Sequence, residues 1–302
     1  MRVGVIGAGV MGQNHLRICS ELKQVTEALV HDVRQPAAEA AARRVGATVA
    51  GSLETLLDAA DAVSICVPTP FHLETAGRVA EAGVPMLIEK PICANVDEGD
   101  RLLEMLPGGL AVGVGQIERF NPIVEEIRKI VREPLYVELK RHNPASTRIT
   151  GTSIVEDLMI HDIDILAHVL FPGSPYRVAS AGDGDICSAL FRFDGCHAYL
   201  SASRKSSKKI RSIYIEEEER TIEGDFMAQE VYVHRKPGQY AAEPERYVQE
   251  NIIEKVLVNR VEPLRVELAA FLAAVAGGPA FPVTPTEGVE NLRIAAAVEA
   301  GL

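Results

Sequence analysis

Cysteine is scarce in this chain and is never arranged in pairs. Its five cysteines lie far apart among 302 residues, and no Cys-x-x-Cys spacing occurs. Disulfide frameworks and structural zinc sites both depend on grouped cysteines, so the sequence excludes them as the basis of the fold. We interpret the five side chains as reduced thiols and expect a cytoplasmic protein.

The chain also lacks a long hydrophobic run and an excess of positive charge. No apolar stretch reaches the roughly 18 residues that a membrane helix needs. The first residues enter a strand pattern at once, and we expect no secretory signal peptide. Lysine and arginine number 31 against 42 aspartates and glutamates, a net charge of −11. We therefore expect neither a nucleic acid nor a membrane as a partner.

No internal repeat is visible, and the remaining pattern is that of two domains. With 47% hydrophobic residues the chain can bury a large core. Residues 1–120 alternate strand patterns with helical patterns, which predicts βαβ crossovers and the parallel sheet of an α/β Rossmann domain. The strands are expected at residues 2–6, 27–31, 62–67, 85–88 and 110–115, and the helices at 13–22, 36–45, 52–59, 73–82 and 96–106.

Residues 121–302 have a different texture, in which strand patterns follow one another directly. Consecutive strands predict an α+β domain with a largely antiparallel open sheet, whose last helix can pack back on the first domain. The strands are expected at residues 135–142, 177–181, 186–193, 197–203, 210–216 and 230–234, and the helices at 122–132, 245–256, 262–276 and 287–300.

A glycine-rich turn joins the first strand to the first helix. Its Gly-x-Gly-x-x-Gly spacing in that position predicts a dinucleotide-binding turn, with an ordinary strand-to-helix connection as the alternative. Asp32 lies 20 residues after the last glycine, where a carboxylate binds the ribose hydroxyls of NAD and repels a 2′-phosphate. Arg34 leaves tolerance of a phosphate open. The cofactor-binding residues expected here are Gly7, Gly9, Val10, Met11, Gly12 and Asp32.

Further cofactor contacts are expected beyond the carboxyl ends of the parallel strands, where ligands of such sheets bind. The candidates are Val67, Pro68, Thr69, His72, Glu89, Lys90 and Gln116. Lys90 follows a strand that should be central and buried, so its amine is expected to point into the cofactor crevice. There it can polarise a substrate hydroxyl. The alternative is an ion pair of Lys90 with Glu89 or another acid that holds the turn.

A stripe of ionisable residues marks the helical pattern at residues 154–168. Asp157, His161, Asp164 and His168 fall within a stripe about 60° wide at ~100° per residue, and apolar residues fill nearly all the remainder. This predicts a buried helix with a polar seam, either an active-site wall, a solvated stripe or a structural ion pair. The four side chains span ~16 Å and cannot share one ion. A metal-hydrolase site with Asp157 and His161 as two of its ligands is a further alternative, but no other ligand motif is visible, so we expect no metal site.

Five separated motifs now carry a resemblance. The GxGxxG turn, VPTPFH at residues 67–72, EKP at 89–91, RFNP at 119–122 and the DxxxH pair at 157–161 occur in an order and spacing that resemble the glucose–fructose oxidoreductase, inositol dehydrogenase and rhizopine-catabolism family of NAD(P)-dependent oxidoreductases. The resemblance covers essentially the whole chain. It implies NAD as cofactor, oxidation of a secondary sugar hydroxyl to a ketone, and homodimers or homotetramers formed through the open face of the second sheet.

The resemblance also assigns the family's catalytic residues to Lys90, Asp157 and His161. His161 is suited to take the hydroxyl proton, Asp157 to accept a bond from the imidazole or the substrate, and Lys90 to stabilise the developing alkoxide. Glu156 directly precedes Asp157, unlike the apolar run usual in relatives, so either carboxylate can face the site; the spacing of four to His161 favours Asp157.

A narrower resemblance is to the UDP-N-acetylglucosamine 3-dehydrogenases of this family, which oxidise the C3 hydroxyl. It is carried by MGQNHLR at residues 11–17, IERFNP at 117–122, the basic residues at 140, 141 and 148, and residues 154–165. The expected substrate-binding residues are Arg119, Asn121, Arg141, Arg148, Asp157 and His161. Alternatively, the first two brace the domain junction and the next two lie in exposed loops.

Three smaller questions stay open at this point. The basic run at residues 204–211 is interpreted as a loop that can also help to attract a sugar diphosphate, and His15 as structural. A dehydrogenase of a free sugar or an inositol-type polyol is the alternative activity. A non-catalytic NAD-binding sensor is the alternative of another class, although such a protein needs none of the three catalytic residues.

Overall fold

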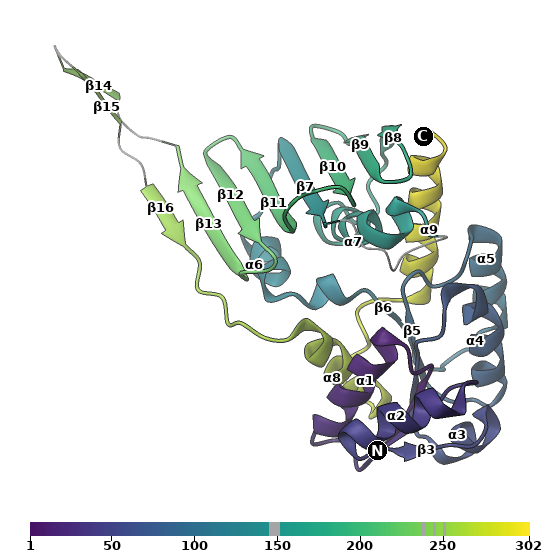
Figure 1. The fold of residues 1–302 in the computed structure, drawn as a ribbon. Coiled ribbons are helices and arrows are strands. Elements are labelled where there is room, and N and C mark those ends of the chain that lie inside the picture. The colour runs from purple at the N-terminus through teal and green to yellow at the C-terminus, as the bar shows by residue number, and fades with distance from the viewer. Residues whose placement is uncertain (145–151, 237–239, 244–245, 250–251) are drawn as a thin grey trace. The chain divides into compact units, whose positions relative to one another are not determined.

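The computed structural model describes residues 1–144, 152–236, 240–243, 246–249 and 252–302. The chain divides into two compact units, Met1–Ile117 with Glu262–Arg293, and Glu118–Val261 with Ile294–Leu302. The first unit therefore includes residues 262–293, which the sequence analysis assigned to the second domain. Figure 1 shows the elements of both units, and each is described by itself below.

The first unit is built on a six-stranded sheet, in which all neighbouring strands are parallel. The spatial order is β3-β2-β1-β4-β5-β6, and the order reverses between β1 and β4, which is the ligand-binding switch point of a Rossmann sheet. The predicted Rossmann fold is confirmed. The strands are β1 (Arg2–Ile6), β2 (Glu27–His31), β3 (Thr48–Val49), β4 (Ala62–Ile65), β5 (Met86–Glu89) and β6 (Val112–Gly115).

Helices cover this sheet, and local capping explains where two of them begin. Ser52 accepts a hydrogen bond from the backbone N–H of Thr55, and Asn95 accepts one from that of Glu98, so each satisfies a free donor at a helix start. The helices are α1 (Val10–Glu21), α2 (Gln35–Val45), α3 (Leu53–Ala59), α4 (His72–Glu81), α5 (Val96–Met105) and α8 (Pro263–Val275), followed by α9 (Pro285–Glu299), which crosses the unit boundary. Helices α1, α2 and α8 share one buried apolar cluster with the strand residues Val3, Val5 and Val30.

The second unit is built on an eight-stranded sheet of order β16-β13-β12-β11-β7-β10-β9-β8. Among the described strands its neighbours pair antiparallel, except for the parallel pair β7 and β10. The predicted largely antiparallel sheet is confirmed. Its strands are β7 (Tyr136–His142), β8 (Arg177–Gly182), β9 (Ile186–Arg192), β10 (His197–Ser203), β11 (Ile210–Glu217), β12 (Arg220–Asp225), β13 (Glu230–Arg235) and β16 (Ile252–Lys255); β14 (Tyr240–Glu243) and β15 (Arg246–Gln249) pair separately.

Two expectations for this unit were wrong. A helix was predicted at residues 245–256, but the segment contains β15 and β16. Strand β16 pairs with β13, about 20 residues earlier, and the spacing of residues within the segment gives no sign of that pairing. Strand β12 was not predicted. It forms a hairpin with β11, and the turn of this hairpin lies in the acidic run at residues 216–219, which was interpreted as a strand end or a loop.

Helical segments cover one face of the second sheet. The buried cluster joins strand residues such as Leu200 and Ile215 to Val124 of α6 (Pro122–Ile130), Ile163 of α7 (Ile160–Ile165) and Ile294 of α9. Among the described residues, no helix combines the length and the apolar character needed to cross a membrane.

Candidate active site

The glycine turn has the geometry that a dinucleotide pyrophosphate requires. Gly7 has a φ of +98°, and a Cβ at Gly12 would lie 1.8 Å from the carbonyl oxygen of Gly7, so both positions need glycine. A Cβ at Gly9, by contrast, would meet nothing within 4 Å. Its open side lies at the start of α1, where backbone N–H groups attract phosphate. Val10, the first residue of α1, is exposed there, and Met11 is half-buried.

Asp32 stands directly after β2 and is tied to this turn. Its Oδ2 accepts a hydrogen bond from the backbone N–H of Ala8 at 2.7 Å, and its Oδ1 accepts one from the backbone N–H of Arg34 at 2.8 Å. Each carboxylate oxygen keeps a second acceptor site, which a ribose hydroxyl can use. The ribose role alone was predicted from the sequence; the hydrogen bond to Ala8, which fixes the turn, was not.

The ends of β4, β5 and β6 carry the remaining predicted cofactor residues. Val67, Pro68 and Thr69 follow β4. His72 is buried: its Nδ1 lies 2.8 Å from the carbonyl oxygen of Pro91, and its Nε2 lies 2.9 Å from that of Val67. Burial lowers the pKa of this imidazole, so the neutral ring donates to one carbonyl at a time and braces the turns after β4 and β5.

Glu89 is the last residue of β5, and the half-buried Lys90 follows it. The peptide bond between Lys90 and Pro91 is cis. Gln116 follows β6 and is 2% exposed. Within the described part of the chain its amide oxygen has no hydrogen-bond partner, which fits a ligand that donates N–H, as a nicotinamide carboxamide does. The open side of Gly9 and this orphaned oxygen show that the first unit fits NAD.

The helix that carries the predicted stripe is not a uniform α-helix, which corrects the sequence analysis. Residues Val155–Met159 and Leu166–Leu170 form π-helical turns on either side of α7. In the first, the backbone N–H of Ile160 bonds to the carbonyl oxygen of Val155, five residues earlier. Such wide turns are rare and often occur at functional sites. Asp157 lies in the first wide turn, and His161 lies one residue into α7.

Asp157 is held by an arginine that the sequence analysis treated as part of a basic loop. The Nη2 and Nε of Arg204 donate to Oδ2 of Asp157 at 3.1 and 3.3 Å. The same Nη2 donates to the carbonyl oxygens of Thr152 and Ser153, each at 3.0 Å. Both charged side chains are mostly buried, at 16% and 12% exposed. Arg204, which directly follows β10, therefore anchors both the carboxylate and the chain that leads into its helix.

The other acids of this helix are engaged in buried ion pairs. Asp164 accepts from the guanidinium of Arg119 through both oxygens, and only 1% of its side chain is exposed. Asp162, which interrupted the apolar shell in the sequence, accepts from Arg141 of β7. The remaining donor of Arg141 reaches Glu118 at 2.7 Å. These pairs fix α7 against the sheet and the segment before α6.

Four predicted substrate ligands thus have defined partners inside the second unit: Arg119, Asn121, Arg141 and Asp157. Arg141 is fully buried rather than in an exposed loop. Asn121 caps α6: its Oδ1 accepts from the backbone N–H of Ile123, and its Nδ2 donates to the carbonyl oxygen of Phe226. Substrate binding by Arg119, Asn121 and Arg141 stays a prediction. Arg148 lies outside the described residues.

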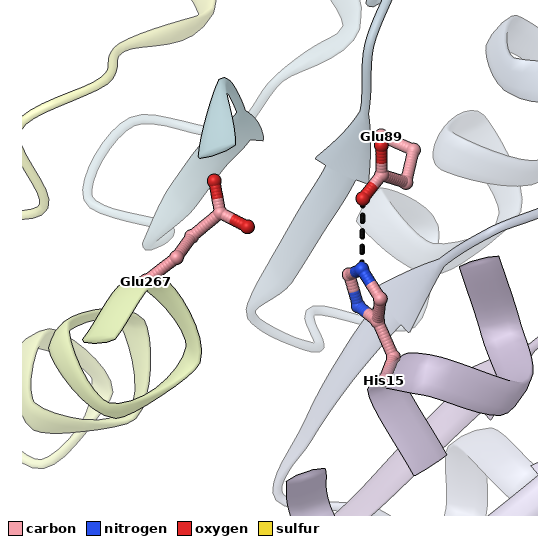
Figure 2. Close-up of side chains that lie close together, drawn as sticks. All are labelled: His15, Glu89 and Glu267. Carbon is pink, nitrogen blue, oxygen red and sulfur yellow. Dashed lines mark hydrogen bonds and ion pairs between the residues drawn. The ribbon is translucent and has the colours of Figure 1, made fainter. Parts of the chain in front are cut away.

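One cluster of possible metal ligands occurs among the described residues. His15 of α1, Glu89 of β5 and Glu267 of α8 are all buried, and one ligand atom of each lies within 4.8 Å of the others. Figure 2 shows the three side chains, which come from three elements of the first unit. Positions 15, 89 and 267 are too far apart in sequence for any spacing rule to have joined them.

A Rossmann sheet with a dinucleotide turn, followed by an α+β unit that carries an acid and a histidine one turn apart, defines an NAD-binding oxidoreductase. The comparisons agree. The profile of a family described as "Oxidoreductase family, NAD-binding Rossmann fold" matches residues 1–115. The UDP-N-acetylglucosamine 3-dehydrogenase of Acidithiobacillus ferrooxidans is 31% identical over 98% of this chain and 95% of its own length. The chain belongs to the glucose–fructose oxidoreductase, inositol dehydrogenase and rhizopine-catabolism family of oxidoreductases.

Two further relatives extend this comparison. The inositol 2-dehydrogenase of Rhizobium meliloti is 26% identical, over 98% of this chain and 94% of its own. Among solved structures, a UDP-N-acetylglucosamine 3-dehydrogenase from Acidithiobacillus ferrooxidans matches with a TM-score of 0.89 and 28% identity, over 100% of this chain and 97% of the other. The chain is therefore similar over its whole length to dehydrogenases of both kinds.

Proposed function

We propose that this protein is an NAD-dependent dehydrogenase that oxidises the C3 hydroxyl of a UDP-N-acetylhexosamine, with UDP-N-acetylglucosamine as the first substrate to test. The carrying observation is the similarity to the Acidithiobacillus ferrooxidans enzyme, which extends over 98% of this chain and includes both units. Similarity confined to the Rossmann unit would support the binding of NAD but not the choice of substrate.

Three residues are proposed to carry the reaction. NAD⁺, which the glycine turn and Asp32 would hold, would supply the acceptor for the hydride of the sugar carbon. His161 takes the proton of the hydroxyl as general base, since an imidazole titrates near neutral pH. The Lys90 ammonium stabilises the negative charge that develops on the same oxygen. Asp157 orients either the imidazole or a neighbouring hydroxyl.

The geometry of the second unit supports this role of Asp157. Arg204 neutralises the carboxylate at 3.1 Å and ties it to the backbone at Thr152 and Ser153. A carboxylate held in this way keeps one orientation, as a group that positions a base or a substrate must. The wide helical turn that contains it is a further sign of a functional segment.

Oxidation of an inositol-type polyol is the second candidate. It is favoured by the inositol 2-dehydrogenases among the relatives, one of which matches over 98% of this chain. The catalytic residues would be the same, and only the groups that bind the rest of the substrate would differ.

A substrate panel tests these proposals together. The purified protein is incubated with NAD⁺ and UDP-N-acetylglucosamine, UDP-N-acetylgalactosamine, UDP-glucose, N-acetylglucosamine or myo-inositol, and NADH is followed at 340 nm. We expect turnover with the UDP-N-acetylhexosamines and a ketone at C3 by mass spectrometry and NMR. Turnover with myo-inositol alone would favour the second candidate, and none with any compound would contradict both.

We also propose that the protein forms a homodimer or homotetramer through the open face of the second sheet. Strand β9 alternates buried residues with the exposed Ile186 and Leu190, which places apolar side chains on the face opposite the helices. Light scattering after gel filtration should give a multiple of the 32.7 kDa chain mass. Leu190→Glu should shift it towards one chain, and a wild-type monomer would contradict the proposal.

A further inference from the structure

The end of β5 is fixed by a carboxylate immediately before Lys90. The Oε1 of Glu89 lies 2.7 Å from Nε2 of His15, and its Oε2 accepts from the backbone N–H of Lys90 at 3.2 Å. Gly115 of β6 leaves space for this carboxylate, because a Cβ there would lie 3.1 Å from Oε1. Glu89 thus connects an imidazole in α1 to the backbone of the lysine.

His15 connects this carboxylate to the next strand of the sheet. The ring is fully buried, and its Nδ1 lies 2.6 Å from Oγ of Ser64 in β4. Because both nitrogens have partners on neighbouring strands, the ring cannot rotate without breaking a buried hydrogen bond. Such a loss leaves a buried donor or acceptor without a partner, which is unfavourable.

Glu267 adds a second buried carboxylate to the cluster, as Figure 2 shows. An ionised carboxylate in this buried site needs positive charge, since an uncompensated buried charge is costly. An imidazolium at His15 supplies one such charge. Burial alone would lower the pKa of His15, but Cys66 and Glu89 outweigh burial and raise it well above its ordinary value. Cys19 also faces the ring, and burial raises its pKa to about 12, so it is a neutral thiol.

The same three residues are possible ligands for a metal ion. The distance between His15 and Glu89 discriminates between a bound metal ion and a shared proton. Ligand atoms bound to one ion at about 2.0–2.2 Å stand about 3 Å or more apart. The 2.7 Å between His15 Nε2 and Glu89 Oε1 is instead the length of a charge-assisted hydrogen bond. The geometry therefore fits a shared proton.

We infer that His15 is a positioning residue for Lys90. Through the contact of its Nε2 with Oε1 of Glu89, it holds the Glu89 carboxylate against the lysine backbone, and this fixes the point from which the Lys90 amine extends. The inference rests on the proposed catalytic role of Lys90. Helix α1, which follows the glycine turn, would then position Lys90 through His15, in addition to any role of that helix in binding NAD.

The test compares the wild type with His15→Leu, which removes both ring hydrogen bonds, and His15→Gln, whose amide N–H can replace Nε2. Competitive acetylation followed by mass spectrometry reports the reactivity of Lys90 against pH without requiring turnover. Kinetics with NAD⁺ and UDP-N-acetylglucosamine are measured alongside. We expect His15→Leu to shift the Lys90 reactivity curve and to lower kcat about 100-fold, with KM changed by at most about twofold. His15→Gln should recover most of both effects.

Each other outcome has one meaning. Unchanged Lys90 labelling and kcat in a folded His15→Leu variant would overturn the inference. A wild type without turnover would contradict the proposed function, while the labelling would still decide the role of His15. If His15→Leu fails to fold, Glu89→Gln, which keeps the shape and removes the charge, carries the same expectations. One equivalent of metal in the purified protein would show that a metal ion, rather than a proton, joins His15 to Glu89, and would overturn the inference.

Discussion

The carboxylate of Asp157 is bound by the guanidinium of Arg204, which also binds two backbone carbonyls at the start of the same helical segment. A candidate catalytic acid and the chain leading to it are thus fixed by one side chain from the end of β10.

Arg204→Gln should lower kcat about 100-fold, because Asp157 loses its charged partner and the helix start loses its anchor. The measurement is steady-state kinetics on the substrate identified by the panel. Lys205→Gln is the matched control: Lys205 pairs with Asp185 on the surface, where its side chain is 56% exposed, and such pairs contribute little. Equal losses in the two variants would show that Arg204 has no special role.

Removal of the proposed base or cation should abolish most of the chemistry. His161→Asn and Lys90→Met are each expected to lower kcat by about 10²–10⁴, the usual range for a general acid or base. NAD⁺ binding, followed by quenching of NADH fluorescence in competition, should change little for His161→Asn. His168→Asn, in the second π-helical turn, is the control and should retain turnover. Full activity in His161→Asn would reassign the base.

Asp32→Asn should alter the choice of cofactor without collapsing the glycine turn. The amide oxygen of asparagine can still accept the 2.7 Å bond from the N–H of Ala8, whereas the negative charge is lost. Hydrogen bonds to a charged group contribute about 1.5–3 kcal/mol, so the Kd for NAD⁺ should rise at least about tenfold. Binding of NADP⁺ should tighten, because the repulsion of its 2′-phosphate is removed. An unchanged ratio of the two Kd values would contradict the ribose role.

Glu118→Gln should destabilise the second unit in a pH-dependent way. Burial would raise the pKa of Glu118, but the guanidinium groups of Arg141 and Arg211 outweigh it and lower the pKa. A carboxylate with a lowered pKa stabilises the fold above its unfolded pKa, and this contribution is lost as the pH falls through the folded value. We expect a loss of about 3–5 kcal/mol at pH 7.

Urea unfolding at pH 7 and at about pH 4 measures this effect, and the difference between Glu118→Gln and the wild type should shrink at the lower pH. Glu125→Gln is the control, since Glu125 pairs with Arg128 on the surface of α6 and should contribute about 0–1 kcal/mol. A difference that did not depend on pH would show that packing, rather than charge, is responsible.

The parts of the fold that sequence could predict were those determined by near neighbours. The glycine turn and the alternation of strands and helices depend on residues within a few positions of each other. Gly7 and Gly12 are examples, since their conformations and contacts lie within one turn. The strand and helix patterns likewise placed Lys90 directly after β5 and placed Asp157 and His161 on a helical segment.

The parts that sequence could not predict depend on distant partners. The proposed role of Asp157 is supported by Arg204, and that of Lys90 by His15 through Glu89, from other elements. The π-helical turns escaped notice because a helical pattern with one extra residue per turn differs little from an α-helix over five residues. Strand β16 was mistaken for a helix because its pairing with β13 is set by sheet register.

The parallel pair of β7 and β10 places the candidate catalytic helix in a crossover. Parallel neighbours cannot be joined by a tight turn, and the chain between these two strands, residues 143–196, contains α7 with its two π-helical turns, then β8 and β9. The pairing of β7 with β10 at the centre of the sheet therefore depends on the connection that contains this helix. Amide hydrogens of β7 and α7 should accordingly exchange with solvent in one cooperative opening, so the enzyme would lose its proposed base and the middle of its sheet in the same event.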